Sequence, residues 1–225
     1  MRYIRRISTI LLVVLFVMGC TIPAFAASGT CEIYYFTYPG SVGSGGSANI
    51  AASLSNMGYS AYRYADTHAY YVRRTMNNDK VFAIVSHGLP GRLICQNGET
   101  TVSASSVSSD DNNYSLAAAF SSGAFSNMLF AYYGACYTAQ TDSTYGNLTT
   151  YTTNTLSAKC ALGFTTYISN TCAPIYENVL FSYLEQGYSV SSANVYAKQA
   201  VINSIGAYGN IDQTIISGNP YTTIS

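Results

Sequence analysis

The chain alternates between short apolar runs and segments in which apolar residues recur every three or four positions. The runs are rich in β-branched and aromatic residues, which predicts buried strands at 31–37, 59–64, 81–88, 128–136 and 159–167. The helically spaced segments predict helices at 48–57, 67–76, 116–120, 174–186 and 190–204. Because strands and helices follow each other in turn, the pattern predicts an α/β fold with a mostly parallel central sheet and right-handed crossovers.

Weaker patterns predict the connections between these elements. An Asn97-Gly98 pair between two short strands predicts a hairpin at 92–102. The segments 38–47, 103–113 and 137–158 predict loops, the last of which could hold a helix. No phosphate-binding motif accompanies the glycines of the first loop.

Two expectations concern the carboxyl-terminal third of the chain. In the helix at 174–186 we expect Ile175, Val179 and Leu180 to face the core. The tail that follows Gly206 is expected to add a final strand.

The first 26 residues have the pattern of a secretory signal peptide. A basic start with three arginines precedes an apolar core at 10–18 and the cleavage site Ala24-Phe25-Ala26. The pair Gly19-Cys20 resembles the end of a lipobox, so lipoprotein anchoring at Cys20 is the weaker alternative. We therefore expect residues 1–26 to be removed, leaving a secreted single domain at 27–225 without an N-terminal propeptide.

Composition and charge narrow the class of partner. Removal of the signal peptide takes away three of the ten basic residues, which leaves seven against ten acidic residues and a formal charge of −3. Such a surface has no electrostatic attraction for nucleic acid or for anionic lipid. We expect no nucleic acid partner, and no membrane attachment after signal cleavage.

The mature chain carries an odd number of cysteines, namely Cys31, Cys95, Cys136, Cys160 and Cys172. In an exported protein an odd count leaves at least one thiol unpaired or paired between chains. Two disulfides, Cys160 with Cys172 and Cys31 with Cys95, would leave Cys136 free. The alternative is that several of these cysteines are small buried side chains.

One histidine and one cysteine stand at the predicted ends of two strands. The run 81–88 ends in Ser86-His87-Gly88, and the run 128–136 ends in Gly134-Ala135-Cys136. The carboxyl ends of parallel strands share one edge of a sheet, which is the edge where ligands bind. A thiol and an imidazole brought together there form a Cys–His nucleophilic site.

These motifs resemble those of the caspase-like (clan CD) cysteine peptidases, and most of all their CHAT and separase branch. His87 precedes Cys136 by 49 residues, in keeping with a caspase-like order and against the papain order. The hairpin after His87-Gly88 and the ending at 181–194 are similar too, so the resemblance covers about residues 31–205.

The resemblance implies a three-layer α/β/α sandwich and a cysteine endopeptidase that acts on peptide or protein substrates. Cys136 would be the nucleophile, His87 the general base and acid, and the N–H groups of Gly88 and Cys136 the oxyanion hole. No third catalytic residue, no cofactor and no metal are expected.

The chain departs from the pattern at the position two residues before the cysteine. Many relatives carry an acidic residue there that binds a basic side chain, whereas this chain has Gly134. Asp66 could line the substrate pocket instead, but the favoured role is as an N-cap of the following helix. The second histidine, His68, is expected to be a surface residue at the start of that helix.

Two further readings remain open at this point. A catalytically inactive caspase-like domain would act as a secreted module that binds peptide or protein, because a fold alone does not confer activity. A secreted redox protein is the remotest reading, since the chain has no C-x-x-C motif. If the enzyme is made latent, we expect the activating cleavage in the polar segment 137–158.

Overall fold

A computed structural model describes residues 27–37, 43–105, 112–206 and 209–225. The expected signal peptide, residues 1–26, and the alternative anchor at Cys20 lie outside the described residues. Parts of two predicted loops, 38–42 and 106–111, lie outside them as well. Among the described residues, none of the helices combines the length and the apolar character that crossing a membrane requires.

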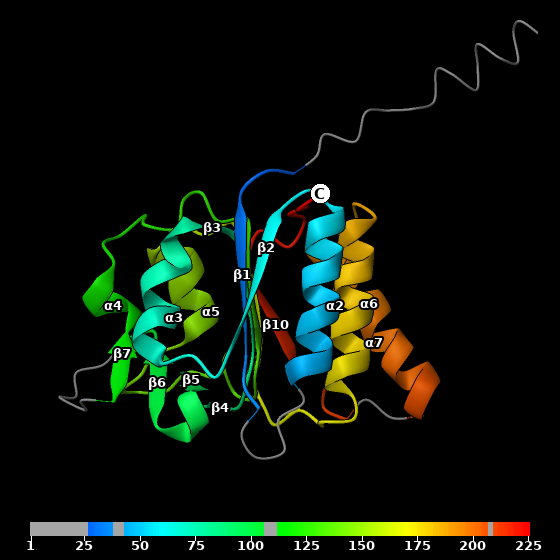
Figure 1. Ribbon diagram of the computed structural model, residues 1–225. Helices are drawn as coiled ribbons and strands as arrows, with labels where there is room; N and C mark the ends of the chain where they lie inside the picture. The colour runs from blue at the N-terminus through cyan, green and yellow to red at the C-terminus, as the bar shows by residue number, and fades with distance from the viewer. Residues whose placement is uncertain (1–26, 38–42, 106–111, 207–208) are drawn as a thin grey trace, which may run out of the picture.

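A six-stranded sheet forms the middle layer of the molecule (Figure 1). Its strand order is β10-β9-β8-β3-β1-β2, and all neighbours are parallel except β10 and β9. The strands are β1 (Thr30–Tyr35), β2 (Ser60–Ala65), β3 (Asp79–Val85), β8 (Phe130–Gly134), β9 (Cys160–Phe164) and β10 (Thr214–Gly218). The mostly parallel sheet and the final strand that the sequence predicts are therefore confirmed.

Helices and a smaller sheet cover the two faces (Figure 1). One face is covered by α2 (Gly43–Asn56), α6 (Ala173–Glu185) and α7 (Val190–Ile205). The other is covered by α3 (Ala69–Thr75), α4 (Leu116–Ala119), α5 (Leu148–Thr150) and the sheet β4 (Gly88–Leu89), β5 (Arg92–Cys95), β6 (Thr100–Ser103), β7 (Asn113–Ser115).

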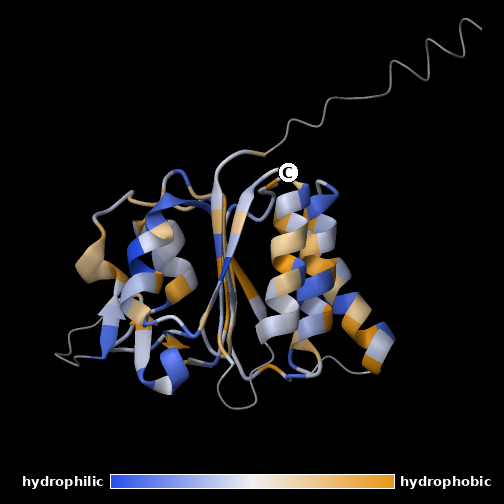
Figure 2. Cartoon of the chain, viewed as in Figure 1, coloured by the Kyte–Doolittle hydropathy of each residue, from blue (hydrophilic) through white to orange (hydrophobic). Residues whose placement is uncertain are grey.

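The central strand β3 shows why its run of apolar residues is continuous. Val81, Ala83 and Val85 pack into the core on the α2 side, whereas Phe82 and Ile84 pack into the core on the α3 side. A parallel strand covered on both faces buries every side chain, so the usual alternation of polar and apolar residues is lost. Figure 2 shows apolar residues concentrated along the central strands between the helical layers.

Helix α2 begins five residues earlier than its apolar spacing predicts, at Gly43 rather than Ala48. Its added first turn contains the glycines that suggested a loop. A Cβ atom on Gly46 would lie 1.9 Å from Oε2 of Glu177 in α6. The glycine lets the two helices approach closely, a tertiary reason that local propensity does not contain.

The inner face of α6 is rotated from the predicted one. Leu180 is fully buried as expected, but Ile175 and Val179 are only partly buried. Tyr176 and Glu177 are fully buried in their place. Burial of a carboxyl group is unusual, and an apolar periodicity assigns such a residue to the wrong face.

The segment 137–158 is packed rather than an open loop. It contains α5 and a π-helical turn at Tyr151–Thr155, and Leu148, Thr149 and Thr152 are fully buried. The hydroxyls of Thr152 and Tyr133 lie 2.6 Å apart and share a hydrogen bond. Because buried threonines find partners of this kind, a polar composition does not mark this segment as exposed.

All five described cysteines are free thiols, so neither predicted disulfide is present. Cys31 belongs to the core on the α2 side of the sheet, whereas Cys95 belongs to the core on the α3 side. The sheet separates these two thiols. The alternative prediction, that several cysteines are small buried side chains, is confirmed: the exposed fraction is at most 2% for Cys31, Cys95, Cys160 and Cys172.

Candidate active site

His87 and Cys136 follow two neighbouring strands at the carboxyl edge of the sheet. Val85 of β3 pairs with Gly134 of β8, and the Ser86 N–H donates to the Gly134 carbonyl over 3.2 Å. Each functional residue therefore stands two positions beyond a paired residue. Both side chains line the same open cavity of about 80 Å³, so the structure brings together the pair that the sequence singled out.

The histidine turn is fixed by β5 of the following hairpin. The Ile94 N–H donates to the His87 carbonyl over 2.9 Å. The Ser86 hydroxyl donates to the His87 carbonyl over 3.0 Å and also contacts the Ile94 carbonyl. These bonds involve the backbone of His87 and not its imidazole ring.

The turn that carries Cys136 is held by hydrogen bonds to the buried threonine Thr138. The Thr138 side chain is fully buried, and its hydroxyl donates to the Ala135 carbonyl over 3.1 Å. The same hydroxyl accepts from the Phe164 N–H of β9 over 3.4 Å. Tyr137, between the cysteine and this threonine, has a left-handed φ of 61°, a conformation that costs a non-glycine residue free energy. The turn is thus held in a strained shape directly after Cys136.

The thiol of Cys136 is half-buried and accepts one backbone hydrogen bond. The Ile168 N–H points at Sγ over 3.4 Å. Burial raises the pKa of Cys136 above its ordinary value, and this effect outweighs the opposing influence of the N–H groups of Ile168 and of Cys136 itself. The resting thiol is therefore protonated near neutral pH and needs a base to become a nucleophile.

Gly88 lies against the backbone of the cysteine turn. A Cβ atom at this position would be 2.1 Å from the Cys136 carbonyl oxygen, so only glycine fits. The bond from the Ile94 N–H to the His87 carbonyl makes Gly88 and Leu93 a non-hydrogen-bonded pair of the β4–β5 ladder. The Gly88 N–H is consequently not used by that ladder.

The walls of the shared cavity are small or neutral. Apart from His87, none of its described lining residues is acidic or basic: Gly43, Val85, Ser86, Gly134, Cys136, Tyr167, Ile168, Asn170 and Ala173. The ring of Tyr132 packs against Gly134, so that a Cβ atom on Gly134 would lie 2.6 Å from Cε1 of Tyr132. His87 is therefore the one residue among this described lining that can carry a side-chain charge near neutral pH.

A buried carboxyl group stands one helical turn beyond this cavity. Glu177 follows the lining residue Ala173 by four positions, and its Oε1 accepts from the Tyr132 hydroxyl over 3.3 Å. Its other oxygen has no hydrogen-bond partner among the described residues. Burial raises the pKa of Glu177 to about 8, so the group is mostly neutral at pH 7.

Neither Asp66 nor His68 is among the residues that line the cavity shared by His87 and Cys136. Asp66 accepts from the Thr37 N–H over 2.8 Å and from the Thr37 hydroxyl over 2.6 Å, so it ties together the ends of β1 and β2. It does not cap α3, so its predicted role as an N-cap is wrong. It is not among the lining residues of the cavity shared by His87 and Cys136, and its predicted role in substrate binding stays a prediction. The N-cap is His68, whose Nδ1 accepts from the Tyr70 N–H over 3.1 Å. An imidazole nitrogen can accept in this way, but it is not among the residues that usually mark an N-cap.

Several residues of the site carry no sequence signal. Ile168 contacts the thiol through its backbone, and Gly43 reaches the cavity only because α2 begins early. Thr138 stands within the Gly134–Ala139 motif, where a buried hydroxyl after the cysteine could have been suspected. Among the described residues, no three His, Cys, Asp or Glu side chains lie together in a way that could hold a metal ion.

Comparison with solved structures gives the fold a context. Gingipain R, an Arg-specific cysteine proteinase, superposes with a TM-score of 0.64 at 12% identity over 91% of this chain and 49% of its own. Caspase-1 from Spodoptera frugiperda gives 0.54 at 11% identity over 88% and 90%. Separase, in a Saccharomyces cerevisiae separase–securin complex, gives 0.52 at 14% identity over 92% and 13%.

These likenesses show that the chain has the caspase-like fold. The chain spans about half the length of gingipain R and most of the length of caspase-1. No protein-family model and no curated protein matches at the level of sequence. The narrower resemblance to the CHAT branch stays a prediction.

Proposed function

We propose that the protein is a secreted cysteine endopeptidase that uses Cys136 and His87. The observation that carries this proposal is that both residues line one cavity at the carboxyl edge of the sheet, each on a turn held by hydrogen bonds. The caspase-like fold supports the class of reaction, because the three solved relatives include cysteine proteinases.

The reaction would proceed through an acyl-enzyme. His87 takes the proton of the Cys136 thiol, and Sγ forms a bond to the peptide carbonyl carbon. The oxyanion accepts from the N–H groups of Gly88 and Cys136. His87 then gives its proton to the leaving amine as the C–N bond breaks. Water hydrolyses the thioester with His87 again as base, which releases the acid and restores the thiol.

The raised pKa of Cys136 assigns a specific task to the histidine. Because the resting thiol is mostly protonated, the reactive thiolate must form by transfer of the proton to His87, both toward a peptide and toward an alkylating reagent. Loss of the imidazole would therefore remove nearly all thiolate at neutral pH.

The first experiment is alkylation of the native protein with iodoacetamide, read by mass spectrometry of peptides. We expect labelling of Cys136 ahead of the other four described thiols, because those four are buried. His87→Ala should slow the labelling at least tenfold, and a mixture of peptide substrates should protect the thiol. Cys136→Ala should abolish cleavage of that mixture. Equal labelling rates with and without His87 would overturn the proposal.

A second candidate function is favoured by one observation. The Cys136 thiol has a raised pKa, whereas most activated cysteines have a lowered one. This fits a non-catalytic domain that binds a peptide or a protein chain in the same cavity. Such a module would cleave no peptide, and it would still bind its peptide when Cys136 is replaced by Ala.

A further inference from the structure

A second cavity opens on the other side of His87. It has a volume of about 210 Å³ and is lined by Phe36, Ser86, His87, Ile94, Cys95, Asn97 and Gly98. The cavity shared with Cys136 contains Val85, Ile168 and Ala173, which belong to or contact the core on the α2 side. The second cavity contains Phe36 and Cys95, which belong to the core on the α3 side. Ser86 and His87 are the residues common to both.

We propose that this second cavity binds an apolar side chain from the leaving segment of the peptide substrate. The inference rests on the proposed function. The amine that departs takes its proton from His87, so the chain beyond the scissile bond must pass over the imidazole. The second cavity is lined by His87 but not by Cys136, so it adjoins the group that would protonate the leaving amine.

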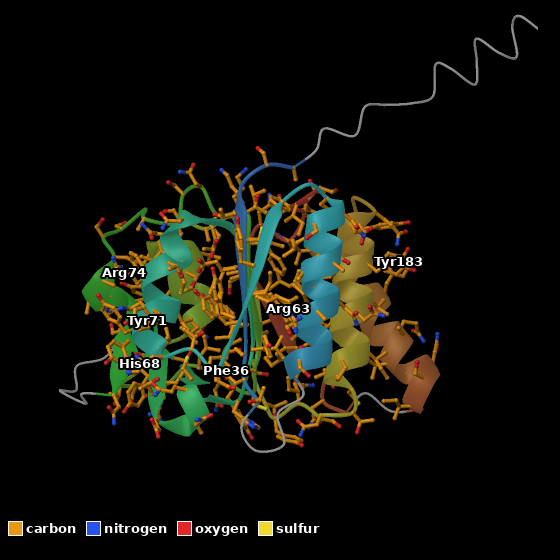
Figure 3. All side chains as sticks on the ribbon, in the orientation of Figure 1. Phe36, Arg63, His68, Tyr71, Arg74 and Tyr183 are labelled. Carbon is orange, nitrogen blue, oxygen red and sulfur yellow. The ribbon has the colours of Figure 1, made fainter. Side chains whose placement is uncertain are left out.

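The lining determines which side chain the cavity accepts. Phe36 lines the cavity, is 3% exposed and directly follows β1; Figure 3 labels it near the lower ends of the central strands. Ile94 is half-buried and forms a wall. Burial raises the pKa of the Cys95 thiol, which keeps it uncharged, and apart from His87 none of the described lining residues is acidic or basic. An aspartate side chain would lose its hydration here and find only the imidazole that the proposed reaction uses, whereas a leucine or phenylalanine side chain would lose its contact with water.

The hairpin gives this cavity a fixed geometry relative to the histidine. The backbone of Ile94 bonds to both His87 and Ser86, so the wall and the general acid move together. A side chain seated in the cavity would hold the scissile nitrogen close to the imidazole. Its contribution belongs to acylation alone, because the leaving segment is gone before the thioester is hydrolysed.

The test compares peptides that share one acyl half. A sequence cleaved from a peptide mixture is resynthesised with Leu, Phe, Gly or Asp at the first and at the second position after the scissile bond. We expect kcat/KM to be about tenfold to a hundredfold higher for Leu and Phe than for Asp at one of the two positions. Hydrolysis of the common thioester intermediate should not differ among them.

Two variants assign the effect to the cavity. Ile94→Lys should lower kcat/KM for the Leu peptide at least tenfold and raise it for the Asp peptide. Leu89→Lys, an exposed residue on the neighbouring strand β4 that does not line the cavity, should stay within twofold of the wild type. Ile94→Ala serves where the lysine prevents folding, and it should reduce the preference for Phe and Leu without reversing it.

The outcomes separate this inference from the function on which it rests. Cleavage without a preference at either position, or a preference that survives both Ile94 variants, overturns the second cavity as a subsite and leaves the Cys136–His87 site intact. A different result would refute the peptidase itself: the wild type cleaves no peptide, and iodoacetamide labels Cys136 at the same rate in the wild type and in His87→Ala. This inference would then fall with the proposed function.

Discussion

At the scale of single residues, the candidate site depends on close contacts that a larger side chain would disrupt. Gly88 approaches the Cys136 carbonyl so closely that the histidine turn and the cysteine turn are packed as one unit. Thr138 bonds that unit to β9, and Ser86 bonds it to β5. The position of the reactive groups is thus determined by neighbours that have no chemistry of their own.

Gly88→Ala tests this close packing. A methyl group 2.1 Å from the Cys136 carbonyl oxygen must separate the two turns, because a backbone atom cannot rotate away. The N–H donors would part, and loss of one such donor costs about a hundredfold to a thousandfold in rate. We expect kcat/KM to fall by at least about a hundredfold while the circular dichroism spectrum is retained. An alanine variant with full activity would mean that the two turns do not form the oxyanion hole.

At the scale of elements, α2 and α6 meet through small residues and a buried carboxyl group. Their contact lies on the α2 side of the sheet, where the amino-terminal turns of both helices reach the cavity through Gly43 and Ala173. Glycine is a poor helix former, so a glycine-rich first turn forms here only because packing against Glu177 and the sheet stabilises it.

Two adjacent glycines of α2 provide a matched pair of variants. A Cβ atom on Gly45 meets nothing within 4 Å, whereas one on Gly46 meets the Glu177 carboxyl group at 1.9 Å. Gly45→Ala should stabilise the protein by up to about 1 kcal/mol through helix propensity. Gly46→Ala should destabilise it by about 1–3 kcal/mol, because the buried carboxyl group must move within a packed core. Urea unfolding of the two variants measures both, and equal stabilities would contradict the observed contact.

At the scale of the whole molecule, buried acids link stability to pH. Asp79 starts β3 and is 1% exposed. Burial, followed by the neighbouring charge of Glu32, raises the pKa of Asp79 to about 9. Its carboxyl group keeps its proton in the folded state at pH values where the unfolded chain has lost it. The stabilisation is complete below the ordinary pKa of 3.8 and is lost as the pH rises toward 9.

The free energy of unfolding should therefore decrease between pH 5 and pH 9. Asp79→Asn has no proton to lose at this position, so its stability should decrease less, and its advantage over the wild type should grow with pH. Guanidinium unfolding at pH 5, 7 and 9 measures this difference. Glu99→Gln, on the exposed hairpin, is the control. Parallel pH profiles for the wild type and Asp79→Asn would contradict the burial of an ionisable acid at Asp79.

The sequence by itself determined the features that depend on local pattern. The order of strands and helices, the parallel sheet and the placement of His87 and Cys136 after neighbouring strands all follow from apolar runs that end in small residues. Such runs form strands wherever the core lies, because their burial is favourable on either face. The caspase-like architecture follows from that order.

Only the tertiary structure decided which groups meet. The early start of α2, the buried face of α6, the packed segment 137–158 and the unpaired cysteines depend on contacts between residues far apart in the chain. Asp66 and His68 show the same limit, since their hydrogen-bond partners are set by how β1, β2 and α3 are packed. The second cavity beside His87 exists only because Phe36 and Ile94, 58 positions apart, are brought together by the sheet and the hairpin. The spacing of apolar residues predicts which side chains are buried, but it does not predict which residues they contact in the folded protein.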